Sequence, residues 1–539
     1  MAGMNDFTLP EISAEATPDF ADGTSCAAWL AELPLVNVAP SQIRLLEQLR
    51  QLNRFDMEPS ERLLVLEALR EPVYFVQAEQ IKKLASKPLP LTQVERGIFG
   101  LVAQTWQELL LGYQRCLMHA LEGKLAGQSA LICQRALDCV AAGMFDHCRT
   151  YHAVPEAYWS TLHKLYRHAE NAKAVSSMVA DSVRKMDVCC AEVYVRALLF
   201  MLANPNEQPQ KQLIQIQHWL ELWAQHVPVR SSPPEDKSLP HLMLDSSAAA
   251  GAYREVDANG RQVSHWLDIG ELARALKTLV VRLRKGETPA SLGLGEDCAM
   301  PGVEQVLVLL FRLWCEGKNG RVQTRRSTSA RAQVCSTFAS MHFHISGSTF
   351  RQPSHIVGAA MTRQEHDEIA TFGHASRRHE EAHIEAGGYA IEDWLLHEES
   401  LSGLRLYRPT TATGGRYALT QLLAVRPGDA KNFFIGVVRW LKTEEDDGLH
   451  LGARIIPGVP RAVAVRPTGI NAQSEKFVPA FYCPALAALA SPASLILPPG
   501  WYRPKRVLEV YSDTSESFLL TGVIERGSDF ERVAIETAR

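Results

Sequence analysis

The chain has 539 residues, of which 46% are hydrophobic and 22% are charged, and its formal net charge is −4. This composition is typical of a soluble globular protein and excludes a wholly disordered or membrane-embedded chain. The length exceeds what a single hydrophobic core serves, which predicts several domains. The small negative net charge provides no overall positive field, so we expect no nucleic-acid partner.

The start of the chain and its apolar runs indicate where the protein resides. The first 20 residues are polar and acidic, without the basic start and apolar stretch of a secretion signal. The most apolar runs, Val193–Ala203 and Val303–Trp314, are far shorter than the roughly 20 residues that a membrane span needs. We therefore expect a cytoplasmic protein without a transmembrane segment.

The sequence contains 11 cysteines, and none forms a Cys-x-x-Cys pair. Several of them, including Cys133, Cys139 and Cys335, lie in apolar sequence. This pattern favours buried, reduced thiols and speaks against a structural zinc site built from cysteines.

The first part of the chain has helical spacing of its apolar residues. Residues 1–35 read as a disordered acidic lead, and an all-helical domain is expected over 36–228. Thr92 and Glu95 form a capping pattern at the entrance of one helix, and Pro72 is expected to end the helix before it. Amphipathic helices with short connections indicate a bundle or solenoid. The helices are predicted over 93–120, 130–142, 155–172, 174–186, 190–202 and 210–226.

The remainder changes from helical to β character. Residues 229–317 read as a linker followed by two helices, over 268–285 and 301–315. After Gly320, short segments rich in β-branched and aromatic residues alternate with Gly, Pro and Asp. They predict an antiparallel barrel over 318–465 and a second β region over 466–539, which either completes the first barrel or forms its own. The fold class is therefore multidomain α + β.

Three features occur in a fixed order within residues 318–465. The run Arg-Val-Gln-Thr-Arg-Arg at 321–326 precedes the first strand, and Glu-Glu-Ser-Leu-Ser-Gly at 398–403 leads into a later one. The run Gly-Val-Val-Arg-Trp at 436–440 then precedes a strand that contains Gly452. The order of these features, rather than any one of them, indicates the kind of domain.

Together these features resemble the PilZ domain, the cyclic-di-GMP receptor barrel of bacteria. That family carries Arg-x-x-x-Arg before its first strand, matched here by Arg321 and Arg325. It also carries an Asp/Asn-x-Ser-x-x-Gly turn, matched by Ser400 and Gly403 with Glu398 in the acidic position. The resemblance covers about a quarter of the chain and implies a PilZ-type barrel.

The resemblance also implies a ligand and its site. Arg321, Arg325 and Arg326 would hold phosphate and guanine, and Glu398, Ser400 and Gly403 would hold the second guanine edge. Guanidinium groups pair with phosphate oxygens through forked hydrogen bonds, and a carboxylate accepts from two N–H groups of guanine. The implied protein is a cyclic-di-GMP-binding regulatory effector, not an enzyme. It needs no cofactor, and its helical region would contact an unidentified protein partner.

Two departures from the family pattern define an alternative. Glu398 is one methylene longer than the usual Asp, and a polar, His-rich insertion near Pro353–Gly388 widens the gap between Arg326 and Ser400. The alternative is a degenerate PilZ-like scaffold or adaptor that binds no nucleotide.

Histidine patterns raise a third possibility, a metal-dependent hydrolase. His379 and His383 match the His-Glu-x-x-His arrangement of zinc proteases, although the flanking sequence is polar. His342 and His344 are predicted to share one face of a strand, where His355 or His366 would complete a metal site. The sequence has no phosphate-binding loop, dinucleotide fingerprint or nucleophile elbow. We therefore expect neither a resident metal ion nor an enzymatic activity.

Overall fold

The computed structural model describes residues 7–236, 239–254, 257, 260–316, 326–353, 389–410, 414–469 and 475–538. The chain forms two compact units. The first contains Met1–Lys87 and Leu91–Arg321, and the second contains Pro88–Pro90 and Val322–Arg539. The first unit is largely helical and the second is built from strands, which confirms the predicted α + β fold class.

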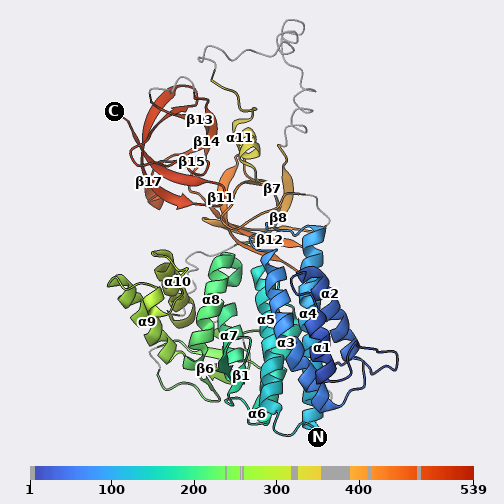
Figure 1. Ribbon diagram of the computed structural model, residues 1–539. Coiled ribbons are helices and arrows are strands. Elements are labelled where there is room, and N and C mark those ends of the chain that lie inside the picture. The colour runs from blue at the N-terminus through green and yellow to red at the C-terminus, as the bar shows by residue number, and fades with distance from the viewer. Residues whose placement is uncertain are drawn as a thin grey trace. The chain divides into compact units, whose positions relative to one another are not determined.

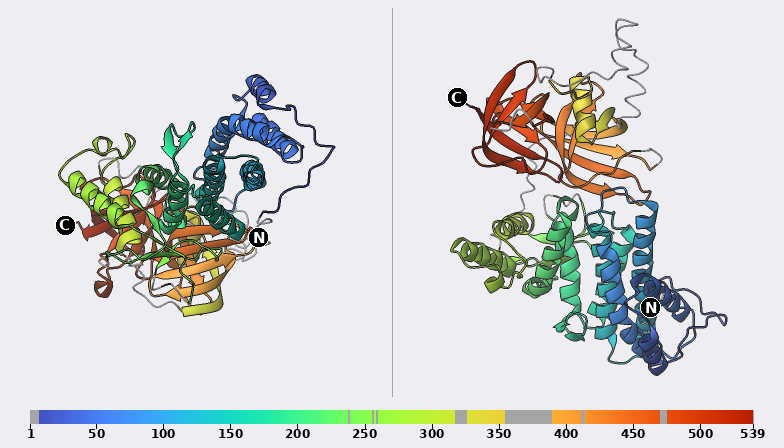
Figure 2. Two further views of the ribbon diagram at one scale, coloured as in Figure 1. Left: turned by 90° about the horizontal axis from the view of Figure 1, so that it is seen from below. Right: turned by 45° about the horizontal axis from the view of Figure 1, so that its top comes forward.

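The first unit is built on long helices that run side by side (Figures 1 and 2). Each of α4, α5 and α7 packs against two or more others, so their buried faces share one core. The helices are α1 (Gly23–Glu32), α2 (Val38–Leu52), α3 (Pro59–Lys82), α4 (Gln93–Leu121), α5 (Ser129–Arg149), α6 (Glu156–Asn171), α7 (Cys190–Leu202) and α8 (Gln210–Trp223).

Local capping explains where several of these helices begin. The predicted capping box at α4 is confirmed, because Thr92 accepts from the Glu95 N–H and Glu95 accepts from the Thr92 N–H. Helix α1 corrects the expectation of a disordered lead over residues 1–35. Asp22 and Ser25 form its capping box, and the helix buries Cys26 and Trp29.

Two further helix predictions were wrong. Pro72 lies inside α3 rather than at its end, because buried residues on both sides of it, including Leu69 and Val73, stabilise the helix across the lost backbone hydrogen bond. Residues 174–186 contain no helix. They contain strand β1 (Val179–Asp181), which forms a hairpin with β2 (Met186–Val188). The Asp181 carboxylate accepts from the backbone N–H groups of Val183 and Arg184 and so fixes the turn.

The segment expected as a linker holds a small sheet with strand order β3–β6–β4–β5. Its strands are β3 (Val229–Arg230), β4 (Leu242–Leu244), β5 (Tyr253–Arg254) and β6 (His265–Leu267). The two helices expected after it are present as α9 (Gly270–Arg284) and α10 (Gly302–Phe311).

The second unit contains two closed six-stranded antiparallel barrels, drawn in orange and red in Figure 1. The order in the first is β10–β11–β12–β9–β8–β7 and in the second β13–β14–β15–β18–β17–β16, so residues after 460 form a barrel of their own. The first consists of β7 (Arg326–Cys335), β8 (Glu392–Ser400), β9 (Gly403–Arg408), β10 (Leu422–Pro427), β11 (Phe434–Thr443) and β12 (Leu449–Ile455). The second consists of β13 (Arg461–Pro467), β14 (Val478–Cys483), β15 (Ser494–Leu497), β16 (Val507–Tyr511), β17 (Ser515–Arg526) and β18 (Glu531–Thr537).

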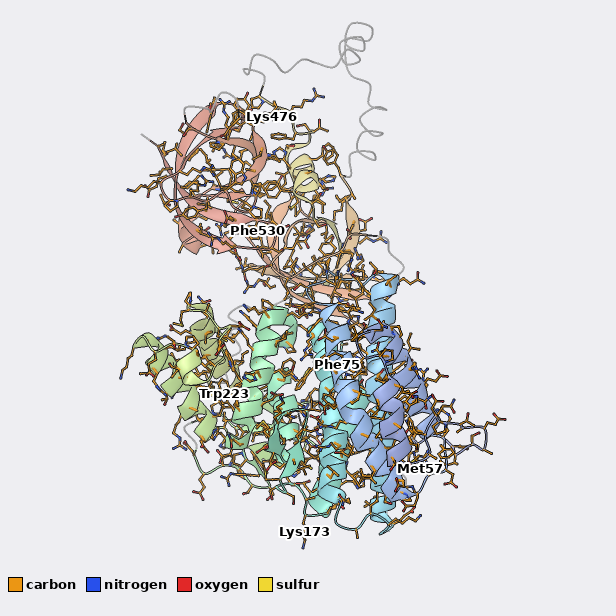
Figure 3. All side chains as sticks on the ribbon, in the orientation of Figure 1. Met57, Phe75, Lys173, Trp223, Lys476 and Phe530 are labelled. Atoms are coloured by element: carbon orange, nitrogen blue, oxygen red, sulfur yellow. The ribbon has the colours of Figure 1, made fainter. Side chains whose placement is uncertain are left out.

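The two barrels share one hydrophobic cluster. Leu422, Ile435 and Val437 of the first barrel pack with Phe481 and Phe530 of the second, the last labelled in Figure 3. Met341 of helix α11 (Phe338–Ser346) belongs to the same cluster. Because the cluster is buried and continuous, the barrels pack as one body.

Helix α11 corrects the expected strand that would have carried His342 and His344. The Thr337 side chain caps its start and Gly347, with a φ of 75°, ends it. In a helix, residues two apart point in different directions. The His342 ring nitrogen instead lies 3.3 Å from the Val463 carbonyl, and a His344 ring nitrogen lies 3.0 Å from the Tyr389 carbonyl.

Three residues from the connection between α3 and α4 belong to the barrel unit. Leu89 forms an antiparallel bridge with Tyr417, with both N···O distances at 2.7 Å. The Arg416 guanidinium donates to the carbonyls of Pro88 and Pro90 over 2.6–3.1 Å. The chain therefore contributes to this unit at two places far apart in sequence.

The 11 cysteines are all free thiols, ten of them buried and Cys298 half-buried, as the sequence predicted. Among the described helices, none is long and apolar enough to cross a membrane.

Candidate functional site

Four of the six predicted site residues fall at one end of the first barrel. Glu398 and Ser400 end β8, Gly403 begins β9, and Arg326 is the first residue of β7. Strand β8 pairs with both of the others, so these four residues lie on three adjacent strands. Arg321 and Arg325 lie outside the described residues.

The β8–β9 hairpin gives this end its shape. Ser400 and Gly403 face each other across a two-residue turn, and the Ser400 hydroxyl donates to the Gly403 carbonyl at 3.2 Å. A Cβ on Gly403 would lie 3.3 Å from the Ala453 carbonyl oxygen of β12, which is tighter than ordinary contact. Glycine therefore lets β12 approach this hairpin closely. Leu401 at the tip is 91% exposed.

Charged side chains pair across the strands behind the hairpin. Glu398 faces Arg405 of β9, and Arg405 Nη1 lies 2.9 Å from Glu398 Oε1. Arg326 faces Glu399, with 3.9 Å between Nη1 and Oε1. The acidic position of the sequence motif is thus already paired with an arginine that the sequence analysis did not include.

The register aligns Glu398 with a half-exposed tryptophan on the outer face of the barrel. Across four strands, Glu398 pairs with Arg405, Arg405 with Gly452, and Gly452 with Trp440. Directly paired residues share a face, and neighbours such as Leu406 and Leu451 point into the buried interior. This row therefore faces outward.

Gly452 explains why Trp440 lies flat on that face. A Cβ on Gly452 would come within 1.9 Å of the Trp440 indole nitrogen, so only glycine leaves room for the ring. The ring lies beside Arg405 and Glu398 in the row. An aromatic face, a guanidinium and a carboxylate are the groups that stack a base, bind an anion and accept from a purine edge.

A second outward row carries aromatic rings. The rings of His397 and Tyr407 stack with 5.4 Å between centroids, and the rings of Tyr407 and His450 lie 4.6 Å apart. Burial, together with the positive charge of Arg405, lowers the pKa of His450 to about 4. His450 is therefore neutral at pH 7, and its buried ring packs against Tyr407 without adding charge to this face.

Arg454 extends the positive end of the face toward the second barrel. It pairs with Gly403 across β12 and β9, one strand from Ser400. Its guanidinium is ion-paired with Glu525 of β17, and Arg439 lies 3.9 Å from the other oxygen of the same carboxylate. The face thus adjoins the junction of the two barrels.

Arg405, Arg454 and Trp440 were not among the predicted site residues. Trp440 was noted only as part of the Gly-Val-Val-Arg-Trp run, and neither arginine was noted. Alternation along β9 and β12 would have marked both arginines as outward-facing. Their position beside Glu398 and Gly403 follows only from the strand register, which the sequence does not show.

The metal hypotheses gain no support from the described residues. Within that part of the chain, no three His, Cys, Asp or Glu side chains are grouped so that they would hold a metal ion. His355, His366, His379 and His383 lie outside the described residues.

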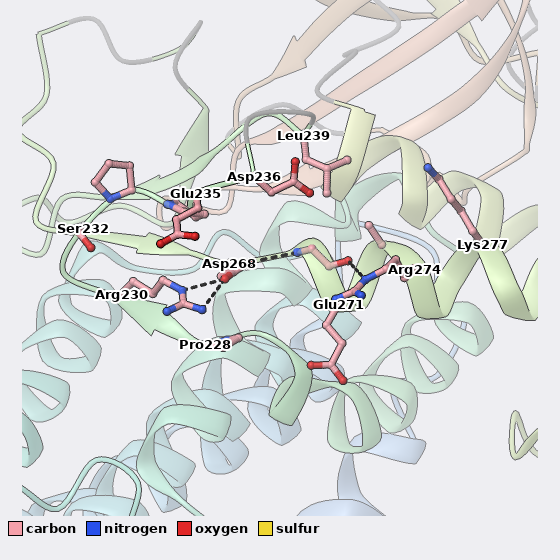
Figure 4. Close-up of a pocket in the computed structure, with 14 residues that line it drawn as sticks. Pro228, Arg230, Ser232, Glu235, Asp236, Leu239, Asp268, Glu271, Arg274 and Lys277 are labelled. Carbon is pink, nitrogen blue, oxygen red and sulfur yellow. Dashed lines mark hydrogen bonds and ion pairs between the residues drawn. The ribbon is translucent and has the colours of Figure 1, made fainter.

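A hollow of about 690 Å³ lies in the helical unit, between the small sheet and the start of α9 (Figure 4). It contains the ion pair of Arg230 with Asp268, 2.7 Å apart, together with further groups of both signs. Arg274 and Lys277 line it on one side, and Glu235, Asp236 and Glu271 also contribute. Such mixed charge selects neither an anion nor a cation.

The fold and the outer face define a class of protein: a helical domain followed by two antiparallel barrels, the first of which carries the PilZ-type order of residues. Residues 24–235 match the family model described as the N-terminal domain of the cyclic-di-GMP receptor FimW. Residues 463–538 match the model of the FimW C-terminal β-barrel domain.

A curated relative agrees with both domain matches. The cyclic-di-GMP receptor FimW of Pseudomonas aeruginosa is 23% identical over 521 residues, which covers 87% of this chain and 83% of the relative. The chain matches both FimW domain models in order and is similar to this receptor over most of its length. The C-terminal model corresponds to the second barrel, whereas the PilZ-type residues lie in the first.

Proposed function

We propose that this protein is a regulatory effector that binds cyclic di-GMP on the outer face of its first barrel. It acts in the cytoplasm by binding rather than by catalysis. Its helical region transmits the bound state to a protein partner. The curated relative named as a cyclic-di-GMP receptor supports this function over that of a scaffold that binds no nucleotide.

The observation that carries the proposal is the β8–β9 hairpin. Glu398, Ser400 and Gly403 occur there with the spacing of the PilZ turn, and Arg326 begins the strand beside them. Arg321 and Arg325 immediately precede that strand in the sequence. Arginines from this short run would supply the charge that two phosphates need.

The other groups of the face suit the bases of the ligand. The Glu398 carboxylate would accept from the N1–H and N2–H of one guanine, and Arg405 beside it would orient that carboxylate. The half-exposed Trp440 ring offers a stacking surface for a base, worth about 1–3 kcal/mol by analogy with single-stranded nucleic acids.

Isothermal titration of the purified chain with cyclic di-GMP tests the proposal. We expect micromolar or tighter binding, on the order of −8 kcal/mol, because several charged hydrogen bonds act together. The Arg321→Ala/Arg325→Ala protein should lose the binding heat and keep the unfolding temperature of the wild type.

Arg503→Ala provides the matched control, since Arg503 is an exposed arginine before β16 of the second barrel. It should bind as the wild type does. Absence of heat and of any thermal shift in the wild type would refute the proposal and favour the scaffold. Unchanged affinity of the double variant would refute the arginine assignment alone.

A further inference from the structure

The Glu525 carboxylate of the second barrel contacts two arginines of the first. One of its carboxylate oxygens is ion-paired with Arg454, and the other lies 3.9 Å from Arg439. The Glu525 side chain is 19% exposed, whereas Arg454 and Arg439 are 35% and 55% exposed. The carboxylate is therefore more enclosed than the guanidinium groups that hold it.

Arg454 is close to the hairpin of the proposed site. It pairs directly with Gly403, and Gly403 pairs with Ser400. The Ile455 N–H also donates to the Ser402 carbonyl at 2.9 Å, which fixes the hairpin turn to the strand of Arg454. Adjacent strands are about 4.8 Å apart, so a guanidinium at position 454 reaches an anion bound at the hairpin.

The ion pairs on this face differ in whether both partners belong to the same barrel. Arg405 is held by Glu398, and Arg326 faces Glu399, and all four residues belong to the first barrel. Glu525 belongs to the second barrel. Its release therefore changes the contact between the barrels as well as the charge of the site.

Building on the proposed function, we propose that Arg454 and Arg439 are additional phosphate-binding residues and that Glu525 masks them in the absence of ligand. A phosphate of the cyclic dinucleotide takes the place of the Glu525 carboxylate on Arg454. Binding thereby removes one ionic link between the barrels, and the second barrel responds to the nucleotide through this exchange.

The physical basis is competition between two anions for one guanidinium fork. Phosphate and carboxylate both make forked hydrogen bonds to arginine, so they occupy it alternately. The ligand must displace Glu525 and then tolerates its negative charge nearby. Replacing Glu525 by the neutral isostere Gln removes both costs and strengthens binding of the nucleotide.

The test measures cyclic-di-GMP affinity of the full-length chain by isothermal titration. Glu525→Gln should bind about twofold to fivefold more tightly than wild type, which corresponds to a partly exposed ion pair. Arg454→Gln should bind more weakly. In the Arg454→Gln background, Glu525→Gln should have little further effect, because the masked group is gone.

Glu516→Gln is the matched control, because Glu516 is exposed on the same strand and its loss changes the net charge equally. Its affinity should stay at the wild-type value. If the wild type binds but Glu525→Gln binds equally or less tightly, the mask is refuted and the proposed function stands. If neither the wild type nor Glu525→Gln binds the nucleotide, both the masking by Glu525 and the proposed function are refuted.

Discussion

Asp529 links the two barrels through a single carboxyl group. It lies in the β17–β18 connection, and its carboxylate accepts from the Leu422 backbone N–H at 2.9 Å. In the same connection, the Ser528 N–H donates to the Thr420 carbonyl at 3.2 Å. Burial raises the pKa of Asp529 to about 6, so the fold favours its protonated form.

This raised pKa predicts a pH-dependent cost that Asp529→Asn removes. As pH rises from about 4 to about 7, ionisation of the buried carboxyl lowers the free energy of unfolding of the wild type. Asn keeps an acceptor oxygen and does not ionise. Above pH 6 the variant should be more stable by on the order of 1–2 kcal/mol, since the carboxyl is partly solvated and costs less than its full shift.

Denaturant unfolding at pH 4 and pH 8 measures this difference, which should vanish at the lower pH. Asp513→Asn, at an exposed aspartate in the β16–β17 connection, should show no such pH dependence. A variant less stable than wild type at pH 8 would contradict the prediction.

Residues also differed in how far the sequence revealed their roles. Glu398, Ser400 and Gly403 could be selected because a turn motif is contiguous, and the structure brings them together in one hairpin. Arg405 and Trp440 could not be selected, because they join Glu398 only through the pairing of four strands. A tertiary row of this kind has no signal in local spacing.

At the scale of elements, helices with strong local signals were predicted well. Helix α4 carries both a capping box and a long amphipathic run. The hairpin after α6 was missed because it is stabilised by distant charges. Asp181 at its turn is bound by Arg70 of α3, with bonds of 2.8 and 2.9 Å. Sequence periodicity contains no information about such a partner.

The same charges form a buried network that joins α3, α5, the hairpin and α7. The Asp138 carboxylate contacts Arg70 at 3.1 Å, Arg184 at 2.5 Å and Arg196 at 3.2 Å. Although burial alone raises the pKa of Asp138, these arginines outweigh it and hold the pKa far below its usual range. Asp138 is thus the central anion of the helical unit.

Asp138→Asn should therefore destabilise the helical unit strongly. Loss of the central negative charge leaves three buried guanidinium groups undercompensated, at a cost of about 3–5 kcal/mol in the free energy of unfolding. Chemical denaturation followed by helical circular dichroism measures it. Asp187→Asn, at an exposed position on β2, should change stability by less than about 0.5 kcal/mol. Equal stability of the two variants would contradict a structural role for the network.

At the scale of the whole molecule, the barrel unit includes Pro88–Pro90 from the helical half of the sequence. Arg416 donates three hydrogen bonds to carbonyls of this segment, although Arg416 and Pro88 are 328 residues apart. The sequence predicted β character for the region of Arg416 but gave no indication of this partner, because the contact joins a helix connection to a barrel.

Arg416→Met should lower the free energy of unfolding of the barrel unit by about 1–3 kcal/mol, because three carbonyl contacts lose their donor. Thermal unfolding of the full chain measures the change. In a fragment of residues 322–539, which lacks the acceptors, the same substitution should have little effect. A comparable loss in both would show that Arg416 acts through other contacts. Arg503→Met should be neutral in both.

The contribution of Pro88–Pro90 also bears on how such proteins are recombined. A gene segment that begins at the first barrel strand encodes almost all of the barrel unit but not the three residues that pair with Arg416 and Tyr417. Exchange of the barrels between relatives, by evolution or by an engineer, therefore preserves this contact only when the α3–α4 connection is inherited together with them. The three residues Pro88–Pro90 thus require that the α3–α4 connection and the barrels be inherited together.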